Sequence, residues 1–409
     1  MQPLLSSKPL VLVMVGLPAR GKTFIAHKLV RYLGWLGVEA RVFNVGNYRR
    51  EHLGAQQPAT FFDPDNPAGV AARRKMAEAA LDDLLKWLRP AGPGEVAIYD
   101  ATNATRARRD LVHEVCAAHG IEPIFVESVA TDPDIIATTI LHTKLRMPDY
   151  AGMDPEKAVD DFRARIAHYE RAYDPMEEAN RSWVKIVDVG DRVVMNRIRG
   201  ALANRLCFYL SNLHIVPRPV YLSRHGQSEY NVAGRIGGDS GLTQAGTAYA
   251  GRLSTWLRKE LGDQEPRVFT SSLRRTRQTA APLPWPSRPL RHLDEIDAGI
   301  CDGMTYAEIA VNHPDDFAAR QRDKLRYRYP RGESYQDVIE RLEPVILEIE
   351  RQRKPLVIVA HQAVLRCLYA YMTGQPREKG PHLEMPLHTV IRLQPGAYDV
   401  HEVRVPLDG

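Results

Sequence analysis

The sequence predicts two consecutive α/β domains, each with a mostly parallel sheet and helices on both faces. The chain has 409 residues, of which 44% are hydrophobic and 26% charged, a size and composition typical of two globular domains. Short apolar runs alternate with longer segments of helical period from end to end, as in βαβ units. Pro217 and Pro219 interrupt this alternation near the middle of the chain, where a helix cannot continue.

In the first domain we expect five strands, separated by helices such as Ala71–Leu88 and Pro155–Arg171. The expected strands are Leu10–Val15, Ala40–Val45, Val96–Tyr99, Ile124–Val129 and Val184–Val187. A last helix is expected over Val193–Leu210. The domain boundary is then expected within Asn212–Arg218, with the cut near residue 215.

The second domain shows the same alternation and is expected to span residues 216–409, after a first domain at 1–215. Its expected strands are Val220–Leu222, Val268–Thr270, Leu356–Val359 and Val390–Leu393. The proline-rich stretch Pro282–Pro289 contains a P-x-x-P pattern, and we interpret it as a surface loop rather than an interaction ligand.

Composition narrows the class of protein. The four cysteines are far apart with no Cys-x-x-Cys pair, which argues against a disulfide framework or a zinc ribbon. No apolar run reaches the roughly 18 residues of a membrane span, so we expect a cytoplasmic protein without a membrane partner. A net charge of +5 fits anionic small substrates as well as nucleic acid.

A phosphate-binding loop follows the first expected strand and opens a helix. Its residues are Gly16, Leu17, Pro18, Ala19, Arg20, Gly21, Lys22 and Thr23. Backbone N–H groups in such a loop face the phosphates of a nucleoside triphosphate, Lys22 reaches the β- and γ-phosphates, and Thr23 offers its hydroxyl to Mg²⁺. Asp100 ends another expected strand, where a carboxylate for a metal or for an acceptor hydroxyl belongs.

Three arginines, Arg106, Arg108 and Arg109, come at the start of the next helix. They fit a solvated basic face and a clamp on an anionic acceptor equally well, and the residues alone leave this open.

Two histidines in the second domain follow expected strands. His225 lies beside Arg224 after the opening strand, and His361 follows Leu356–Val359. A histidine flanked by arginine suits attack on a phosphomonoester, and we expect the two histidines to converge on one phosphoryl group. Glu295 is the candidate acid for the leaving oxygen.

A basic segment between Arg320 and Arg331 carries six cations interleaved with Tyr327 and Tyr329. It fits a solvated face, a nucleic-acid strip with stacking rings, or a pocket for a doubly phosphorylated sugar. The residues favour the sugar-phosphate pocket.

Taken together, these strings resemble the bifunctional 6-phosphofructo-2-kinase/fructose-2,6-bisphosphatase family over nearly the whole chain. The shared strings include the phosphate loop, Phe43–Gly46, Tyr48–Glu51, Asp100–Asn103, Gly234–Leu242 and His361–Val364. The resemblance implies a P-loop kinase domain followed by a phosphoglycerate-mutase-like histidine phosphatase domain. It also implies a homodimer that makes and hydrolyses fructose 2,6-bisphosphate and binds no nucleic acid.

For the kinase, the resemblance implies ATP and Mg²⁺ bound by the loop together with Thr139 and Lys144. Lys22, Thr23 and Lys144 would serve the transferred phosphoryl group, and Asp100 would lie near the fructose 2-hydroxyl. The residues that would hold fructose 6-phosphate are Arg49, Arg73, Thr102, Arg108, Arg165 and Tyr169.

For the phosphatase, the resemblance implies that His225 becomes phosphohistidine while Glu295 acts as acid and then as base. The residues that would surround the 2-phosphate are Arg224, Asn231, Gly237, Arg275 and His361. Those that would grip the 6-phosphate end are Tyr306, Arg320, Lys324, Tyr335, Gln362 and Arg366.

Two alternatives stay open, one because of departures from the family pattern and one because a basic pocket fixes the charge of a ligand better than the identity of its sugar ring. Ala130 stands where the family usually has cysteine and Thr139 where it usually has asparagine, which leaves a nucleotide-binding regulator with little kinase turnover as one alternative. A kinase–phosphatase pair on another sugar phosphate is the second. Arg275 retains the basic residue that accompanies phosphatase activity, so a competent phosphatase is expected.

Overall fold

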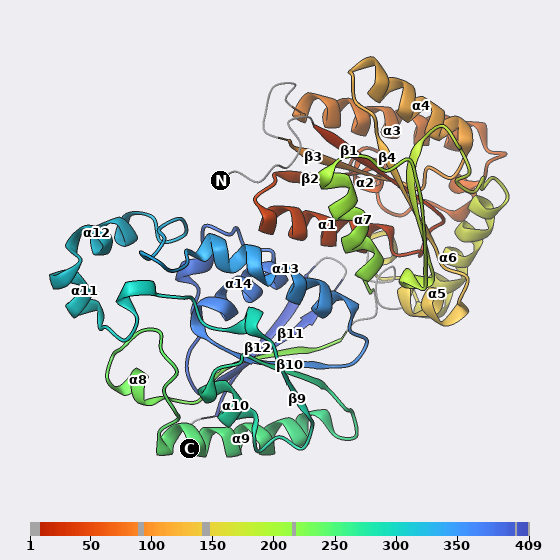
Figure 1. The fold of residues 1–409 in the computed structure, drawn as a ribbon. Helices are drawn as coiled ribbons and strands as arrows, with labels where there is room; N and C mark the ends of the chain where they lie inside the picture. Colours follow the sequence, from red (N-terminus) through yellow and green to blue (C-terminus); the bar gives the residue numbers. More distant parts are fainter. Residues whose placement is uncertain (1–8, 89–93, 141–147, 215–217, 397–398, 408–409) are drawn as a thin grey trace. The chain divides into compact units, whose positions relative to one another are not determined.

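The computed structural model describes residues 9–88, 94–140, 148–214, 218–396 and 399–407. The chain divides into two units, residues 1–33 with 38–215 and residues 34–37 with 216–409, and each contains a six-stranded sheet (Figure 1). Both sheets are mostly parallel with helices on both faces, which confirms the predicted fold class. The predicted cut near residue 215 lies outside the described residues.

The first sheet has the strand order β2-β3-β1-β4-β5-β6. Its strands are β1 (Leu10–Val15), β2 (Ala40–Asn44), β3 (Val96–Asp100), β4 (Ile124–Val129), β5 (Ser182–Val187) and β6 (Arg192–Asn196). The pairs from β2 to β5 are parallel, and only β6 runs antiparallel to its neighbour. The carboxyl ends of β1, β2 and β3 therefore meet at one edge, where ligands bind in such sheets.

Helices cover both faces of this sheet. They are α1 (Lys22–Leu36), α2 (Val45–Leu53), α3 (Pro67–Trp87), α4 (Arg106–Ala118), α5 (Pro133–Thr139), α6 (Pro155–Glu170) and α7 (Ala201–Asn212), with the short turns η1 (Ala59–Phe62), η3 (Pro148–Tyr150) and η4 (Asp188–Gly190). Apolar residues of α3 and α4 pack on the β1 side chains Val11, Val13 and Val15, whereas α1 and α7 lie on the opposite face (Figure 1). The prediction placed α3 four residues too late, because Asn66 caps its first turn and Pro67 opens it.

The helix expected over 193–210 is wrong in its first part. Arg192–Asn196 forms strand β6, which pairs antiparallel with β5, and the helix begins only at Ala201. The connection turns back through Asp188 and Gly190, both in the left-handed region. Because β6 lies at the sheet edge, Val194 and Met195 are both exposed, so its apolar residues lack the alternation that identifies a half-buried strand.

The second sheet has the order β12-β11-β7-β10-β8-β9. Its strands are β7 (Val220–Arg224), β8 (Arg267–Thr270), β9 (Ser287–Pro289), β10 (Leu356–Ala360), β11 (Thr389–Pro395) and β12 (Val400–Pro406). Strand β10 pairs in parallel with β7 and β8, so the residues that follow these three strands share one edge. The stretch interpreted as a loop over 282–289 ends in β9, a short parallel edge strand where proline is tolerated.

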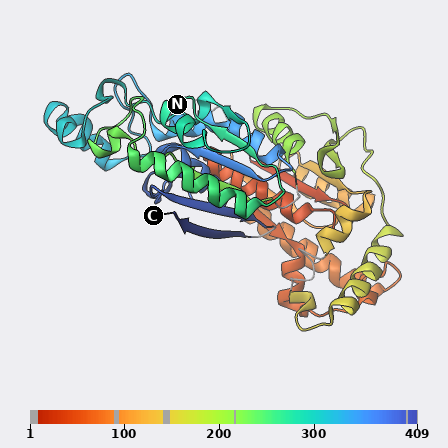
Figure 2. The ribbon, with the colours of Figure 1, turned by 90° about the horizontal axis from the view of Figure 1, so that it is seen from below.

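The helices of the second unit are α8 (Glu229–Val232), α9 (Gln244–Leu261), α10 (Arg274–Ala280), α11 (Tyr306–Asn312), α12 (Pro314–Arg322), α13 (Tyr335–Arg351) and α14 (Gln362–Thr373), with the turns η5 (Arg291–Leu293), η6 (Gly299–Cys301) and η7 (Gly380–His382). Helix α9 covers one face of the sheet, where Tyr249, Leu253 and Leu257 pack on the strands (Figure 2). Helices α13 and α14 pack against each other on the opposite face (Figure 1).

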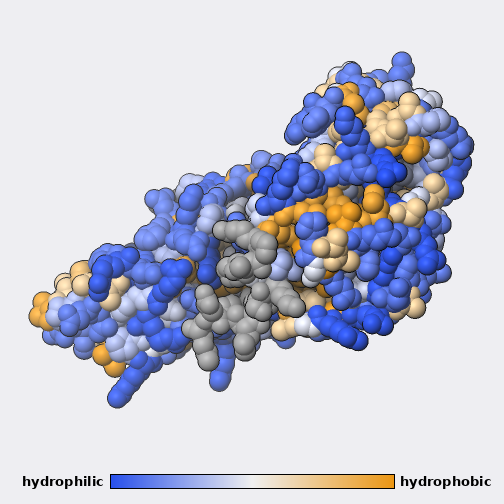
Figure 3. All heavy atoms as spheres, turned by 90° about the horizontal axis from the view of Figure 1, so that it is seen from above, coloured by the Kyte–Doolittle hydropathy of each residue, from blue (hydrophilic) through white to orange (hydrophobic). Residues whose placement is uncertain are grey.

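An apolar patch is exposed on the first unit over α3 and α4 (Figure 3). It includes the partly exposed Leu85, Leu111 and Val115, which together with the buried Leu81 line a groove of about 330 Å³ between the two helices. Among the described helices, none has the length and apolar character needed to cross a membrane. All four cysteines are buried free thiols.

Candidate active sites

The phosphate-binding loop connects β1 to α1 as predicted. A methyl group on Gly16 would collide with the backbone carbonyl of Ser128, and Ala19 and Gly21 both have positive φ angles, of 59° and 75°. This tight left-handed backbone is the kind that presents successive N–H groups to an anion. The Lys22 side chain is folded back over the loop, and its Nζ donates a hydrogen bond of 2.6 Å to the carbonyl of Leu17.

A cavity of about 480 Å³ opens beside this loop. The structure brings to it all the residues predicted for the acceptor sugar and the catalytic carboxylate. Those lining the cavity are Pro18, Lys22, Thr23, Arg49, Arg73, Asp100, Thr102, Arg108, Arg165 and Tyr169. The other loop residues, Gly16, Leu17, Ala19, Arg20 and Gly21, do not line it. Thr139 ends α5 and does not belong to the cavity lining, and Lys144 lies outside the described residues.

The charge balance of this cavity favours an anionic ligand. Six cations face two carboxylates in its lining, namely Lys22, Arg49, Arg50, Arg73, Arg108 and Arg165 against Asp100 and Asp149. Guanidinium groups neutralise phosphate oxygens well because their donors form a planar fork. The cavity therefore suits a ligand with more than one phosphate.

Asp149 is a functional candidate that the sequence analysis missed. It is buried, forms ion pairs with Arg49 and with Arg50 (2.9 Å to the latter), and lies 3.6 Å from Arg165. Burial raises the pKa of this carboxyl, but the adjacent arginines outweigh burial, and the net shift is downward. Asp149 therefore stays ionised and holds these guanidinium groups in place. Asn44 was also missed, and its Nδ2 donates a 2.5 Å hydrogen bond to Asp100 Oδ2.

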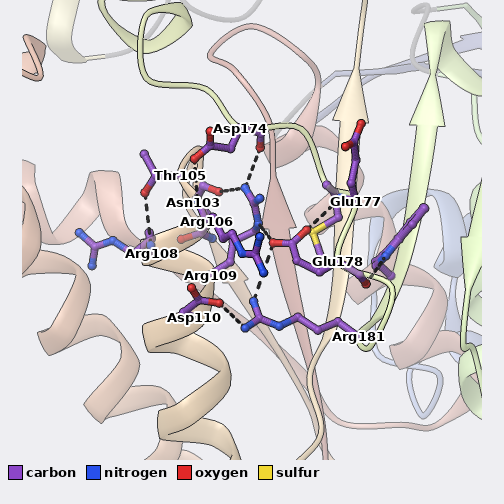
Figure 4. A network of polar contacts seen from close by, with 12 residues as sticks. Asn103, Thr105, Arg106, Arg108, Arg109, Asp110, Asp174, Glu177, Glu178 and Arg181 are labelled. Carbon is purple, nitrogen blue, oxygen red and sulfur yellow. Dashed lines mark hydrogen bonds and ion pairs between the residues drawn. The ribbon is translucent and has the colours of Figure 1, made fainter.

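The three arginines at the start of α4 lie in three different environments. Arg106 is exposed and Arg108 lines the cavity, whereas Arg109 is 1% exposed and lies inside the unit. Figure 4 shows Arg109 reaching Glu178, with Nε 2.8 Å from Oε1, and the backbone around Asp174. For Arg109, neither a solvated face nor a ligand clamp applies, because a carboxylate and backbone carbonyls occupy its donors.

In the second unit, His225 and His361 lie at the shared edge of β7 and β10, with ring centroids 5.1 Å apart. His225 Nδ1 is 2.8 Å from the carbonyl oxygen of Gly226, so Nδ1 carries the proton and Nε2 carries the lone pair. Burial and the positive charges of Arg275 and Arg224 lower the pKa of His225 to about 3. The ring is therefore neutral near pH 7, with Nε2 ready to act as a nucleophile.

Two buried guanidinium groups flank the histidines. Arg224 donates from Nη1 to the carbonyl of Met385 at 2.9 Å, while its buried Nε has no hydrogen-bond partner in the described chain. Arg275 donates from Nε to His361 Nδ1 at 3.2 Å and from Nη1 to the carbonyl of Gly238 at 2.7 Å. A buried donor without a partner costs free energy, so the Nε of Arg224 marks a place for an anion.

The Glu295 carboxylate is held by two backbone N–H groups, one from the next residue and one from the start of α14. Its Oε1 accepts hydrogen bonds from the backbone N–H of Ile296 at 3.0 Å and of Ala363 at 3.1 Å. These two bonds hold the carboxyl group by one oxygen. Oε2 is then the atom available to carry and exchange a proton.

Most of the residues predicted for the far end of the substrate make hydrogen bonds in separate pairs. Arg320 donates to the hydroxyl of Tyr306 at 2.8 Å, and Arg366 donates to the hydroxyl of Tyr335 at 3.1 Å. Lys324 donates to the carbonyl of Pro381 at 2.9 Å, and its pKa is lowered to about 8 by burial and by Arg366 and Arg320. Gln362 opens α14 beside His361.

The remaining predicted residues lie in and after α8, in the connection from β7 to α9. Asn231 closes a capping box with Ser228 at the start of α8. Gly237 has a φ of 72°, and a methyl group there would collide with Asp302.

The basic segment is not a continuous strip. Arg320 and Lys324 are half-buried, whereas the four remaining cations, Arg322, Arg326, Arg328 and Arg331, are exposed. Tyr329 is 5% exposed and packs edge to face on Tyr327, with ring centroids 5.1 Å apart. The two rings therefore do not form an exposed stacking platform for bases.

Sequence reasoning also missed Ser271, which follows β8 at the same edge as the histidines. Its Oγ lies 2.7 Å from His361 Nε2 and 2.8 Å from Thr276 Oγ1. No local motif singled out this serine, because its contact with His361 spans 90 residues of sequence.

Comparison with known proteins matches both halves of the chain to enzyme families. The 6-phosphofructo-2-kinase family matches residues 1–217, and the histidine phosphatase superfamily (branch 1) matches residues 220–405. The chain is 47% identical over 400 residues to 6-phosphofructo-2-kinase/fructose-2,6-bisphosphatase 3 of Rattus norvegicus, which covers 97% of this chain and 72% of that relative.

Two further relatives show the same range of identity. The chain is 48% identical over 399 residues to 6-phosphofructo-2-kinase/fructose-2,6-bisphosphatase 1 of Rattus norvegicus, covering 97% of this chain and 84% of the relative. It is 48% identical over 405 residues to the 6-phosphofructo-2-kinase/fructose-2,6-bisphosphatase of Arabidopsis thaliana, covering 97% of this chain and 54% of the relative.

Proposed function

Because the chain belongs to the bifunctional 6-phosphofructo-2-kinase/fructose-2,6-bisphosphatase family, we propose that it both makes and hydrolyses fructose 2,6-bisphosphate. The first unit transfers the γ-phosphoryl group of ATP to fructose 6-phosphate, and the second returns fructose 6-phosphate and inorganic phosphate. The observation that carries the proposal is that each unit has a cationic site suited to a phosphate group, the cavity beside the loop and the buried histidine–arginine cluster.

In the kinase reaction, the 2-hydroxyl oxygen of the sugar attacks the γ-phosphorus, and the bond from that phosphorus to the ADP oxygen breaks. Asp100 accepts the hydroxyl proton, and Asn44 fixes the carboxylate through Oδ2. Lys22 and the cavity arginines position the phosphates and neutralise their charge.

The residues present fit ATP and Mg²⁺. No cluster of three histidine, cysteine or carboxylate side chains able to hold a metal occurs in the described ranges. Mg²⁺ does not need such a cluster, because it is usually bound by one or two protein oxygens together with the substrate phosphates. Thr23 and Asp100 would supply those protein oxygens, and the bound ion would neutralise phosphate charge during the transfer.

In the phosphatase reaction, His225 Nε2 attacks the 2-phosphorus while the bond from phosphorus to the sugar oxygen breaks. Glu295, protonated at Oε2, gives its proton to that oxygen, and Arg224 and Arg275 neutralise the phosphoryl oxygens. Water then attacks the phosphohistidine, and the Glu295 carboxylate takes the water proton. Phosphate leaves, and His225 returns to its neutral form.

We also propose a cytoplasmic homodimer. Four buried free thiols suit a reducing compartment, and the dimer follows from the family resemblance.

Phosphorus NMR of two variants tests the proposal. His225→Ala protein with Mg-ATP and fructose 6-phosphate should accumulate an acid-labile 2-phosphate while ATP falls, because the nucleophile that would remove the product is missing. Lys22→Ala protein should hydrolyse added fructose 2,6-bisphosphate normally but form none. Loss of ATP without a sugar phosphate product in His225→Ala would refute the kinase assignment. Hydrolysis of the bisphosphate by the same variant would refute the nucleophile.

A further inference from the structure

We propose that Ser271, supported by Thr276, is a positioning residue of the hydrolytic site: it fixes His361 with its proton on Nε2, and His361 in turn holds the Arg275 guanidinium. The inference rests on the proposed function of the second unit.

The hydroxyl pair lies in the interior of the unit. Ser271, Thr276 and His361 are each 0% exposed, and Arg275 is 4% exposed. No water reaches these side chains to replace a missing partner, so each polar atom depends on its neighbours in the protein. The hydrogen bonds among these side chains therefore form one continuous series, and the donor and the acceptor of each bond can be derived.

The series of hydrogen bonds begins at Arg275. Its Nε lies 3.2 Å from His361 Nδ1, and a guanidinium always donates because it keeps its protons in proteins. Nδ1 must therefore accept, and an imidazole that accepts at Nδ1 carries its proton on Nε2. That Nε2–H donates to Ser271 Oγ at 2.7 Å.

The series of hydrogen bonds ends on the backbone. Ser271 Oγ also accepts from the backbone N–H of Leu273 at 3.1 Å, so both of its lone pairs are used. Its own proton goes to Thr276 Oγ1 at 2.8 Å, and the Thr276 hydroxyl donates to the carbonyl of Leu273 at 2.9 Å. Each hydrogen bond in this series therefore has a fixed donor and a fixed acceptor. Exchanging the two in any bond would place two protons or two lone pairs face to face.

The fixed donor and acceptor roles determine how His361 contacts Arg275. Burial and the charges of Arg275 and Arg224 lower the pKa of His361 well below its usual range, so the ring is neutral. With Nε2 tied to Ser271, the Nδ1 lone pair receives Nε of Arg275, while Nη1 of Arg275 donates to Gly238 at 2.7 Å. These two contacts fix the guanidinium group and leave Nη2 of Arg275 to donate to the transferred phosphoryl group.

The test combines Ser271→Ala and Thr276→Val with ¹⁵N-histidine NMR of the full chain. His361 is assigned by the signal missing from His361→Gln. In the unmodified protein we expect a protonated Nε2 and an unprotonated Nδ1. Ser271→Ala removes the acceptor of the Nε2 proton. Thr276→Val removes the acceptor of the Ser271 proton and allows that hydroxyl to turn toward Nε2. Both should introduce the form protonated on Nδ1.

Hydrolysis should change in parallel. We expect kcat for fructose 2,6-bisphosphate to fall about 10²-fold in Ser271→Ala, as a misplaced positioning group predicts. The matched control is Ser254→Ala, another buried serine of this unit, whose Oγ makes one hydrogen bond of 2.7 Å to the carbonyl of Pro282. It should leave the tautomer and kcat unchanged, and its melting temperature serves as the folding reference for Ser271→Ala.

Two results would overturn the inference: a proton on Nδ1 of His361 in the unmodified protein, or a Ser271→Ala variant with the tautomer and kcat of the control. Absence of hydrolysis in the unmodified protein would instead refute the proposed function. The NMR measurement still decides the role of Ser271 in that case, because it requires no turnover.

Discussion

Replacing Arg109 by methionine should strongly destabilise the first unit. The side chains of Arg109 and Glu178 are 1% and 4% exposed, and their Nε and Oε1 atoms are 2.8 Å apart. Methionine keeps a long side chain but donates no hydrogen bond. Glu178 would be left with the backbone N–H of Glu177 at 2.9 Å and Arg181 at 3.8 Å. A buried carboxylate would thus lose its main partner.

The size of the effect follows from burial. Breaking a buried ion pair by removing one partner costs about 3–5 kcal/mol of the free energy of unfolding. For a domain of this size, each kcal/mol lowers the melting temperature by about 2–4 °C, so a loss of about 4 kcal/mol predicts a fall of about 8–16 °C.

Scanning calorimetry of the full chain is the assay, with the second unit as an internal reference. The matched control is Arg74→Met, because Arg74 and Glu78 form an ion pair of 2.7 Å on the surface, 65% and 47% exposed. Such an exposed pair contributes about 0.3–0.5 kcal/mol, and its loss should move the transition by no more than about 2 °C. Equal shifts in the two variants would refute the argument from burial.

The pH dependence gives a second test of the same variant. Burial raises the pKa of Glu178, but hydrogen bonds from Arg109 and from the backbone outweigh burial, and the pKa is lower than in the unfolded chain. Its contribution to stability is therefore present above the unfolded pKa of about 4.3 and is lost as the pH falls through the folded pKa. Arg109→Met should show a weaker loss of stability on acidification than the unmodified protein.

Two further predictions concern the hydrolytic site. Gly237→Ala should lower kcat for fructose 2,6-bisphosphate about 10²-fold, because the new methyl group would displace Asp302, which accepts from the N–H of Gly238, and the Gly238 carbonyl accepts from Arg275. Gly234→Ala, with a similar φ of 66° but no atom nearer than 4.0 Å, should cost stability only, and equal kinetic losses would contradict the steric argument. The pKa of Lys324 is lowered to about 8 by burial and two neighbouring arginines, so KM should rise as the pH increases from 7 to 9. Lys324→Arg, which stays charged, should lack this rise, and identical alkaline profiles would show that Lys324 does not titrate in binding.

The local sequence pattern was sufficient to predict those residues of both sites that follow strands. The phosphate loop, Asp100, His225 and His361 each lie at or just after the carboxyl end of a strand that contains a buried apolar run, and the carboxyl ends of parallel strands meet at one sheet edge. These positions could therefore be predicted without knowing the rest of the fold.

Residues that act through distant partners could not be predicted in this way. Asp149 lies in a short turn with no motif, and its role exists only because three arginines from two other helices converge on it. Ser271 depends on His361, 90 residues later. The sequence around Arg109 resembles a basic surface, and only the packing of Glu178 against α4 shows that the guanidinium is interior.

An acidifying cell leaves the nucleophile of the second unit unchanged. An ordinary histidine, with a pKa near 6.5, passes from mostly neutral to mostly charged when the pH falls from about 7 to about 6. His225 titrates near 3, so the fraction able to attack phosphorus stays essentially complete over that interval. Hydrolysis of fructose 2,6-bisphosphate would then continue as the pH falls, and any acid sensitivity of the balance between its synthesis and its breakdown must come from groups other than this histidine.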